Sequence, residues 1–78
     1  MKSNLYTMRD RLSGTYGSPF TSVNDASAKR DFNAFCKLPQ NQYLSGDMEL
    51  YKLGEFESDT GEIISYKPEY IMRGEIIE

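Results

Sequence analysis

Residues 47–66, "DMELYKLGEFESDTGEIISY", contain the strongest strand signal in this 78-residue chain. In its first half, apolar residues occur at even positions, Met48, Leu50 and Phe56, and also at odd positions, Tyr51 and Leu53. Because side chains alternate between the two faces of a sheet, this pattern predicts a central strand or one whose back is covered by a partner. Asp59 and Thr60 begin a turn, and Gly61 supplies its positive-φ position. The stretch therefore predicts a β-hairpin, the main one of the fold.

Shorter extended segments flank this hairpin. Residues 5–11, "LYTMRDR", alternate as a half-buried strand does: Tyr6 and Met8 on one side, Thr7, Arg9 and Arg11 on the other. The segment "TYGSPF" that follows predicts a second short extended piece. Near the other end, Pro68 has no backbone N–H to donate to a sheet, so we expect it to interrupt the returning strand. Residues 70–77 are then predicted to form a separate, weak C-terminal edge strand.

One amphipathic helix is predicted over about residues 24–38. Asn24 is suited to cap its first turn, and Val23 is placed to pack on Ala28 as a hydrophobic staple. Pro39 ends the helix because proline breaks the hydrogen-bond ladder. Ala28 forms one apolar stripe with the residues four, seven and eight positions after it, Phe32, Phe35 and Cys36. The "QNQYLSG" segment after Pro39 is predicted to be a polar connection.

Together these segments predict an α+β fold, with one amphipathic helix packed on an antiparallel sheet of about four to five short strands. Residues 1–78 are expected to form a single small domain. A chain of this length buries only a little over about 60% of its unfolded surface, so its core is thin. We therefore expect a homo-oligomer, in which further apolar surface is buried between copies.

The cysteine, histidine and apolar content indicate the cellular compartment and exclude common kinds of catalytic and metal site. Cys36 is the only cysteine, so no intramolecular disulfide can form, and its place on the apolar stripe indicates inert packing. No apolar run approaches a membrane span, which favours the cytoplasm. With no histidine, the usual general base and the commonest metal ligand are missing, so we expect no enzyme, cofactor or metal site. The "DTG" triplet at 59–61 resembles an aspartic-protease motif but lies among charged residues, where a hairpin turn is the better interpretation.

Charge divides unevenly along the chain, whose net charge is -3. Residues 1–38 carry six Lys/Arg against three Asp/Glu, and residues 39–78 carry three against nine. Any nucleic-acid surface must therefore be local to the first half. The candidate binding residues are five cations with one aromatic ring as a stacking surface: Arg9, Arg11, Tyr16, Lys29, Arg30 and Lys37. The alternative interpretation is that the arginines pair with the acidic second half and the aromatic rings belong to the core.

Residues 14–20, "GTYGSPF", are interpreted as a turn that leads from the first strand to the helix, with Phe20 entering the core and Tyr16 left as a candidate contact. Two motifs, "GTYG-x-PF" and "LY-x-x-GEF-x-x-x-TGEI", give residues 5–64 a resemblance to a known family. The chain resembles the small non-structural protein of gokushovirus-type microviruses, which are bacteriophages with circular single-stranded DNA genomes.

This resemblance implies a non-capsid phage protein of the host bacterial cytoplasm that binds DNA, single-stranded DNA in the first place, and acts between viral DNA replication and packaging. The family supplies no set of binding residues, so the candidates above rest on charge alone. The alternative is a homo-oligomeric protein-interaction module that acts on the phage replication protein or procapsid without binding DNA. The thin core and the two-sided strand at 47–57 favour that second hypothesis.

Overall fold

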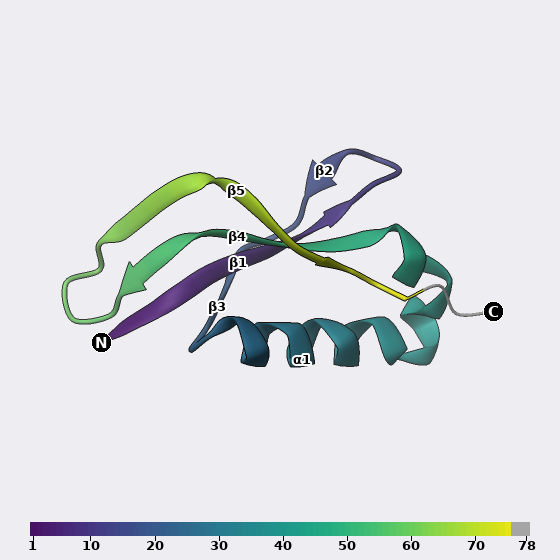
Figure 1. Cartoon of the computed structure of the whole chain (residues 1–78), viewed down its shortest axis with the longest axis horizontal. Helices are drawn as coiled ribbons and strands as arrows, with labels where there is room; N and C mark the ends of the chain where they lie inside the picture. Colours follow the sequence, from purple (N-terminus) through teal and green to yellow (C-terminus); the bar gives the residue numbers. More distant parts are fainter. Residues whose placement is uncertain (76–78) are drawn as a thin grey trace.

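The computed structural model describes residues 1–75 and shows an antiparallel sheet with one long helix beneath it (Figure 1). The elements in chain order are β1 Lys2–Asp10, β2 Thr15–Tyr16, β3 Phe20–Ser22, α1 Asp25–Lys37, the 3₁₀ helix η1 Pro39–Asp47, β4 Met48–Glu57 and β5 Ile63–Arg73. The strands are ordered β2-β1-β4-β5, and β3 pairs with another part of β1. The predicted α+β class is confirmed. No helix within residues 1–75 has the length and apolar character needed to cross a membrane.

The β4–β5 hairpin forms where the sequence predicts it. Gly61 has a φ of 77°, the left-handed conformation that glycine adopts without a steric penalty. Its N–H donates to the Glu57 carbonyl at 2.7 Å, and the Glu57 N–H donates to the Glu62 carbonyl at 2.9 Å. The DTG triplet is thus part of a tight turn between two strands, as expected.

The predicted break at Pro68 is wrong, because β5 continues through it to Arg73. The register shows how: Lys52 is opposite Glu69 and Gly54 is opposite Ser65, so residues 66–68 of β5 face the single residue Leu53. Pro68 therefore lies in a bulge, where a proline removes no ladder hydrogen bond. The predicted separate strand over 70–77 is the second half of β5, and its last two residues lie outside the described residues.

The segment after Pro39 is a 3₁₀ helix rather than an irregular connection. Pro39 opens it, a position where a missing N–H costs nothing. Its polar side chains also complete the end of α1: the Asn41 side-chain amide donates to the Phe35 carbonyl at 2.9 Å, and that of Gln42 donates to the Lys37 carbonyl at 3.0 Å. These residues satisfy carbonyls that a helix leaves unpaired at its C-terminus.

The boundaries of α1 follow the predicted signals, with one exception. The Asn24 side chain accepts a hydrogen bond from the Ser27 N–H at 2.8 Å, which confirms the N-cap. Leu38 is extended ahead of Pro39 and ends the helix. Val23, however, is 63% exposed, so the predicted staple on Ala28 is wrong.

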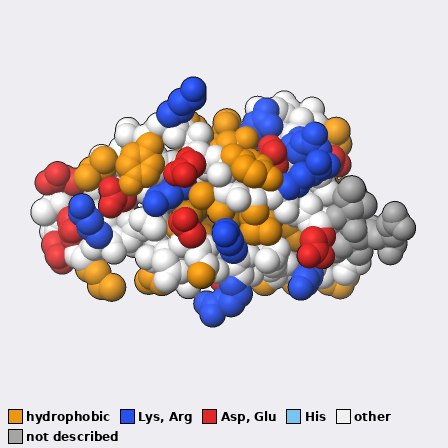
Figure 2. Space-filling view, in the orientation of Figure 1, with side chains coloured by type: hydrophobic (Ala, Val, Ile, Leu, Met, Phe, Trp, Pro, Cys, Tyr) orange, Lys and Arg blue, Asp and Glu red, His pale blue; other side chains and the backbone are white. Residues whose placement is uncertain are grey.

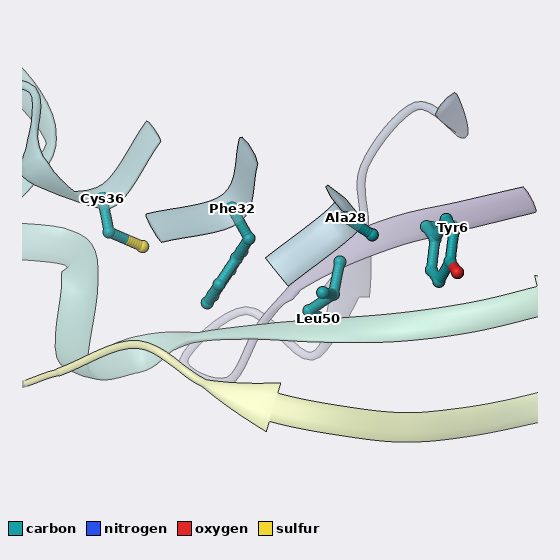
Figure 3. Close-up of a cluster of buried hydrophobic side chains, with 5 residues drawn as sticks. All are labelled: Tyr6, Ala28, Phe32, Cys36 and Leu50. Carbon is teal, nitrogen blue, oxygen red and sulfur yellow. The ribbon is translucent and has the colours of Figure 1, made fainter. Parts of the chain in front are cut away.

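The core lies between α1 and the strands β1 and β4. Its buried hydrophobic residues are Tyr6, Ala28, Phe32, Cys36 and Leu50 (Figure 3). Phe35 and Phe20 pack partly buried around them, and the Phe20 ring stacks on Tyr6 at 5.9 Å. The helical stripe and the inward position of Phe20 are therefore confirmed. Cys36 is buried, and this burial raises the pKa of its thiol, as expected for an inert packing residue.

Gly54 generates a prediction about the sheet, since a Cβ placed on it would lie 1.9 Å from the Ile64 carbonyl oxygen. Gly54→Ala forces β5 away from β4, and we expect it to lower the free energy of unfolding by about 1–3 kcal/mol. Gly17→Ala is the matched control, because its Cβ would meet no atom closer than 3.5 Å. Urea denaturation measures both variants. Equal stability of the two would contradict the close approach of the strands.

Tyr6 generates a prediction about pH. Burial, together with its hydrogen bond to Asp25, raises the pKa of the Tyr6 phenol from 10.0 to about 12. The unfolded chain then loses this proton at lower pH than the native protein does. The contribution of the protonated Tyr6 phenol to the free energy of unfolding is therefore complete below about pH 10 and is lost as the pH rises toward 12.

We expect Tyr6→Phe to cost about 1 kcal/mol at neutral pH, through the lost hydrogen bond. We also expect its stability to fall less than that of the wild type above pH 10. Denaturation midpoints at several alkaline pH values measure the difference. Parallel curves for the two proteins would show that Tyr6 ionises equally in the folded and unfolded states.

Candidate nucleic-acid interface

The candidate interface is the sheet face that α1 leaves uncovered (Figure 1). Tyr6 points into the core from β1. Side chains alternate along a strand, so Thr7 and Arg9, one and three positions later, point to the opposite face. Residues directly opposite one another on paired strands share a face. The register puts Tyr51 of β4 opposite Thr7, Tyr70 of β5 opposite Tyr51, and Tyr16 of β2 opposite Arg9. Three tyrosines from three strands therefore lie on this uncovered face, which we call the tyrosine face.

The three rings form a connected row. The Tyr51 ring meets the Tyr16 ring at a centroid distance of 5.5 Å and the Tyr70 ring at 5.8 Å, both in edge-to-face geometry. Such pairs hold aromatic side chains in defined orientations. Tyr16 and Tyr70, at the two ends of the row, are 47% and 52% exposed. The row thus presents ordered aromatic surface to solvent, which the core does not use.

A positive charge lies against one end of the row. The Arg9 guanidinium carbon is 5.7 Å from the centre of the Tyr16 ring, within the range of a cation–π interaction. Arg9 also donates to the Glu49 carboxylate at 3.2 Å, which holds the guanidinium in place. Figure 2 shows Lys and Arg side chains gathered over the region of β2, while acidic side chains gather at the far end, over the β4–β5 turn.

The predicted binding residues fall into two groups. Arg9 and Tyr16 lie together on the tyrosine face. Arg11, predicted to lie within the first strand, is exposed in the turn one residue beyond the end of β1. Lys29, Arg30 and Lys37 are exposed on the side of α1 that faces away from the sheet, around a shallow depression. Because the core separates the two groups, the six residues do not form one surface. The alternative interpretation, pairing with the acidic half, holds for Arg9 and Glu49.

Sequence reasoning missed Tyr51 and Tyr70 as members of the site. The alternation in 47–57 does place Tyr51 opposite in parity to the buried Leu50. Nothing in the local sequence, however, indicates that Tyr51 adjoins Tyr16, which is 35 positions earlier, because that proximity depends on the strand register. Tyr70 was assigned to a separate edge strand, which hid its place beside Tyr51.

We expect Tyr51 to stabilise the sheet because its ring contacts both neighbours. Tyr51→Leu removes two aromatic pairs worth about 0.5–1.5 kcal/mol each, so the free energy of unfolding should fall by about 1–3 kcal/mol. Tyr43→Leu on η1 is the control, since Tyr43 is 80% exposed. Chemical denaturation compares the two variants. A Tyr51→Leu protein as stable as the control would show that the row contributes nothing to folding.

Comparison with known proteins identifies the family to which the chain belongs. No curated protein and no solved structure matches the chain. The model of a family described as "Phage ORF5 protein" matches residues 3–77, nearly the whole chain. The chain therefore belongs to the Phage ORF5 protein family, and it is a bacteriophage protein.

Proposed function

We propose that this phage protein binds single-stranded DNA through the tyrosine face. The observation that supports this proposal is the row of Tyr16, Tyr51 and Tyr70, with Arg9 against one end of it. Every base has a flat π-face, so exposed rings bind single strands with little sequence preference, and neighbouring cations contact the phosphates. A duplex keeps its base faces stacked inside and cannot use such rings. A single strand is therefore the preferred form.

The distribution of charge supports this assignment despite the net charge of -3. One group of acidic side chains lies over the β4–β5 turn (Figure 2), whereas Glu49 pairs with Arg9 beside the row and Asp10 follows Arg9 in the chain. Arg9 lies at the Tyr16 end of the row, and Arg11 follows it in the chain. In this proposal Arg9 and Arg11 contact the phosphates of the strand.

The wider role is proposed from the resemblance to microvirus non-structural proteins, since the family match identifies a bacteriophage protein without giving its role. A protein that covers single strands in the host bacterial cytoplasm would act between replication of the viral DNA and its packaging. Lys29, Arg30 and Lys37 form a second basic surface on α1, on the other side of the molecule. In this proposal they are secondary to the tyrosine face.

Fluorescence anisotropy of a labelled single strand and of its duplex, at about 50 and 200 mM salt, tests the proposal. We expect the single strand to bind more tightly, with an affinity that falls as salt rises. Tyr16→Leu with Tyr70→Leu should weaken binding on the order of tenfold for each ring lost, because a stacked base is worth about 1–3 kcal/mol.

Two further variants locate the site. Tyr43→Leu on η1 is the matched control and should bind as the wild type does. Changing Lys29, Arg30 and Lys37 together to Glu should weaken binding less than the double tyrosine change. If only the helix variant loses affinity, the site lies on α1. If the wild type binds no single strand even at low salt, the proposal fails.

A second candidate function is homo-oligomeric interaction with phage replication or procapsid proteins. The observation that favours it is β5, an 11-residue strand at the end of the strand order whose exposed apolar side chains include Ile63, Ile64 and Tyr66. An edge strand can pair with another chain, although Pro68 and the bulge beside it limit such pairing. Mass in solution across a dilution series tests this function, and a strict monomer at micromolar concentration would count against it.

A further inference from the structure

A groove of about 390 Å³ opens beside the tyrosine face. It lies between β2, the C-terminal half of α1 and η1, on the helix side of β1, and Tyr16 forms part of its wall. Its volume is at the lower end of the range of small-molecule sites, about 300–1,000 Å³, so it suits one base-sized group rather than a longer segment. The groove and the tyrosine face lie on opposite sides of β1, and they come closest at the sheet edge, where β2 is only two residues long.

The walls of the groove are apolar and partly aromatic. Met8, Phe20, Phe35 and Met48 pack against the core from one side and keep part of their surface open to the groove, and Leu44 of η1 closes it. Apolar surface of this kind gains free energy when a flat ring covers it. Both an apolar wall and an aromatic neighbour therefore favour a planar ligand.

The polar side chains that line the groove are Asp10, Thr15 and Ser18, of which only Asp10 is charged. Asp10 lines it, and one of its carboxylate oxygens accepts the Leu12 N–H at 2.9 Å, which orients the group. A carboxylate is an acceptor only, and each oxygen has more than one acceptor site. Guanine presents two adjacent N–H donors on one edge, whereas thymine places carbonyl oxygens on both sides of its single N–H. Asp10 therefore attracts guanine and repels thymine.

We propose that this groove binds one guanine base of a single strand whose neighbouring bases lie on the tyrosine face. Asp10 accepts the two N–H groups of that base, and the apolar walls cover its ring. Arg11, exposed next to Asp10, is positioned near the backbone of a strand that crosses the β2 edge. The inference rests on the proposed function and gives it a base preference.

The test measures anisotropy of two labelled oligonucleotides of about 12 nucleotides, one of thymidine only and one with a single central guanine. We expect the wild type to prefer the guanine strand on the order of tenfold, the discrimination typical of one well-paired base. Asp10→Asn keeps an oxygen for the Leu12 N–H but introduces a donor. It should lose the preference because the guanine strand binds more weakly, while the thymidine strand binds at least as tightly as it does to the wild type.

Leu44→Trp provides a second variant that fills the groove from η1 and keeps the Asp10 carboxylate, and it should also lose the preference. Tyr43→Trp is its control, because it adds the same ring at a neighbouring residue that does not line the groove. Thermal denaturation checks that each variant folds.

The outcomes separate the two proposals. Binding of both strands without preference, or an Asp10→Asn protein that keeps it, overturns the guanine site and leaves the proposed function intact. Failure of the wild type to bind either strand overturns both. A Leu44→Trp protein that changes the mass in solution and keeps the guanine preference would assign the groove to a protein contact and overturn the inference.

Discussion

The packing of α1 on the sheet is the interaction on which the rest of the structure depends. The stripe of Ala28, Phe32 and Cys36 on the helix packs against the sheet, where Tyr6 of β1 and Leu50 of β4 are buried, and these residues make up the buried hydrophobic core of the described chain (Figure 3). A 13-residue helix is about 20 Å long, whereas the molecule extends 44 Å. One helix therefore covers part of one face, and the rest of the sheet must be stable while exposed to water.

The uncovered face meets this requirement with tyrosines. Tyrosine combines a large apolar ring with a hydroxyl that remains hydrated, so Tyr16, Tyr51 and Tyr70 can pack on one another across strands without forming a purely apolar patch. Arg9 joins this row to Glu49 and so fixes a cation beside a ring. The same contacts that stabilise an exposed sheet thus create a surface on which bases can stack.

Membership of the Phage ORF5 protein family shows that the chain is a bacteriophage protein, and the geometry of this surface is what supports the proposal that it binds single strands. The family places the chain in a bacteriophage, and the ring row is suited to a ligand with flat, unpaired bases. One group of acidic side chains lies over the β4–β5 turn, at the far end from β2 (Figure 2), whereas Glu49 pairs with Arg9 beside the row. The groove below β2 extends the surface from general stacking toward recognition of one base.

Local sequence determined the parts of this protein that depend on neighbouring residues. The apolar stripe of α1, the Asn24 cap, the alternation of β1 and β4 and the Gly61 turn all follow from short-range periodicity and backbone preference. Arg9 and Tyr16 are candidates on other grounds, the uneven charge along the chain and the presence of an aromatic ring.

Only the tertiary structure decided the rest, because strand register is a long-range property. The bulge opposite Leu53 lets β5 pass through Pro68, and the register beyond it sets Tyr70 beside Tyr51. Placement of α1 on one face separates Arg9 and Tyr16 from Lys29, Arg30 and Lys37. Composition thus set which groups are available for binding, while pairing and packing between distant segments decided which of them share a surface.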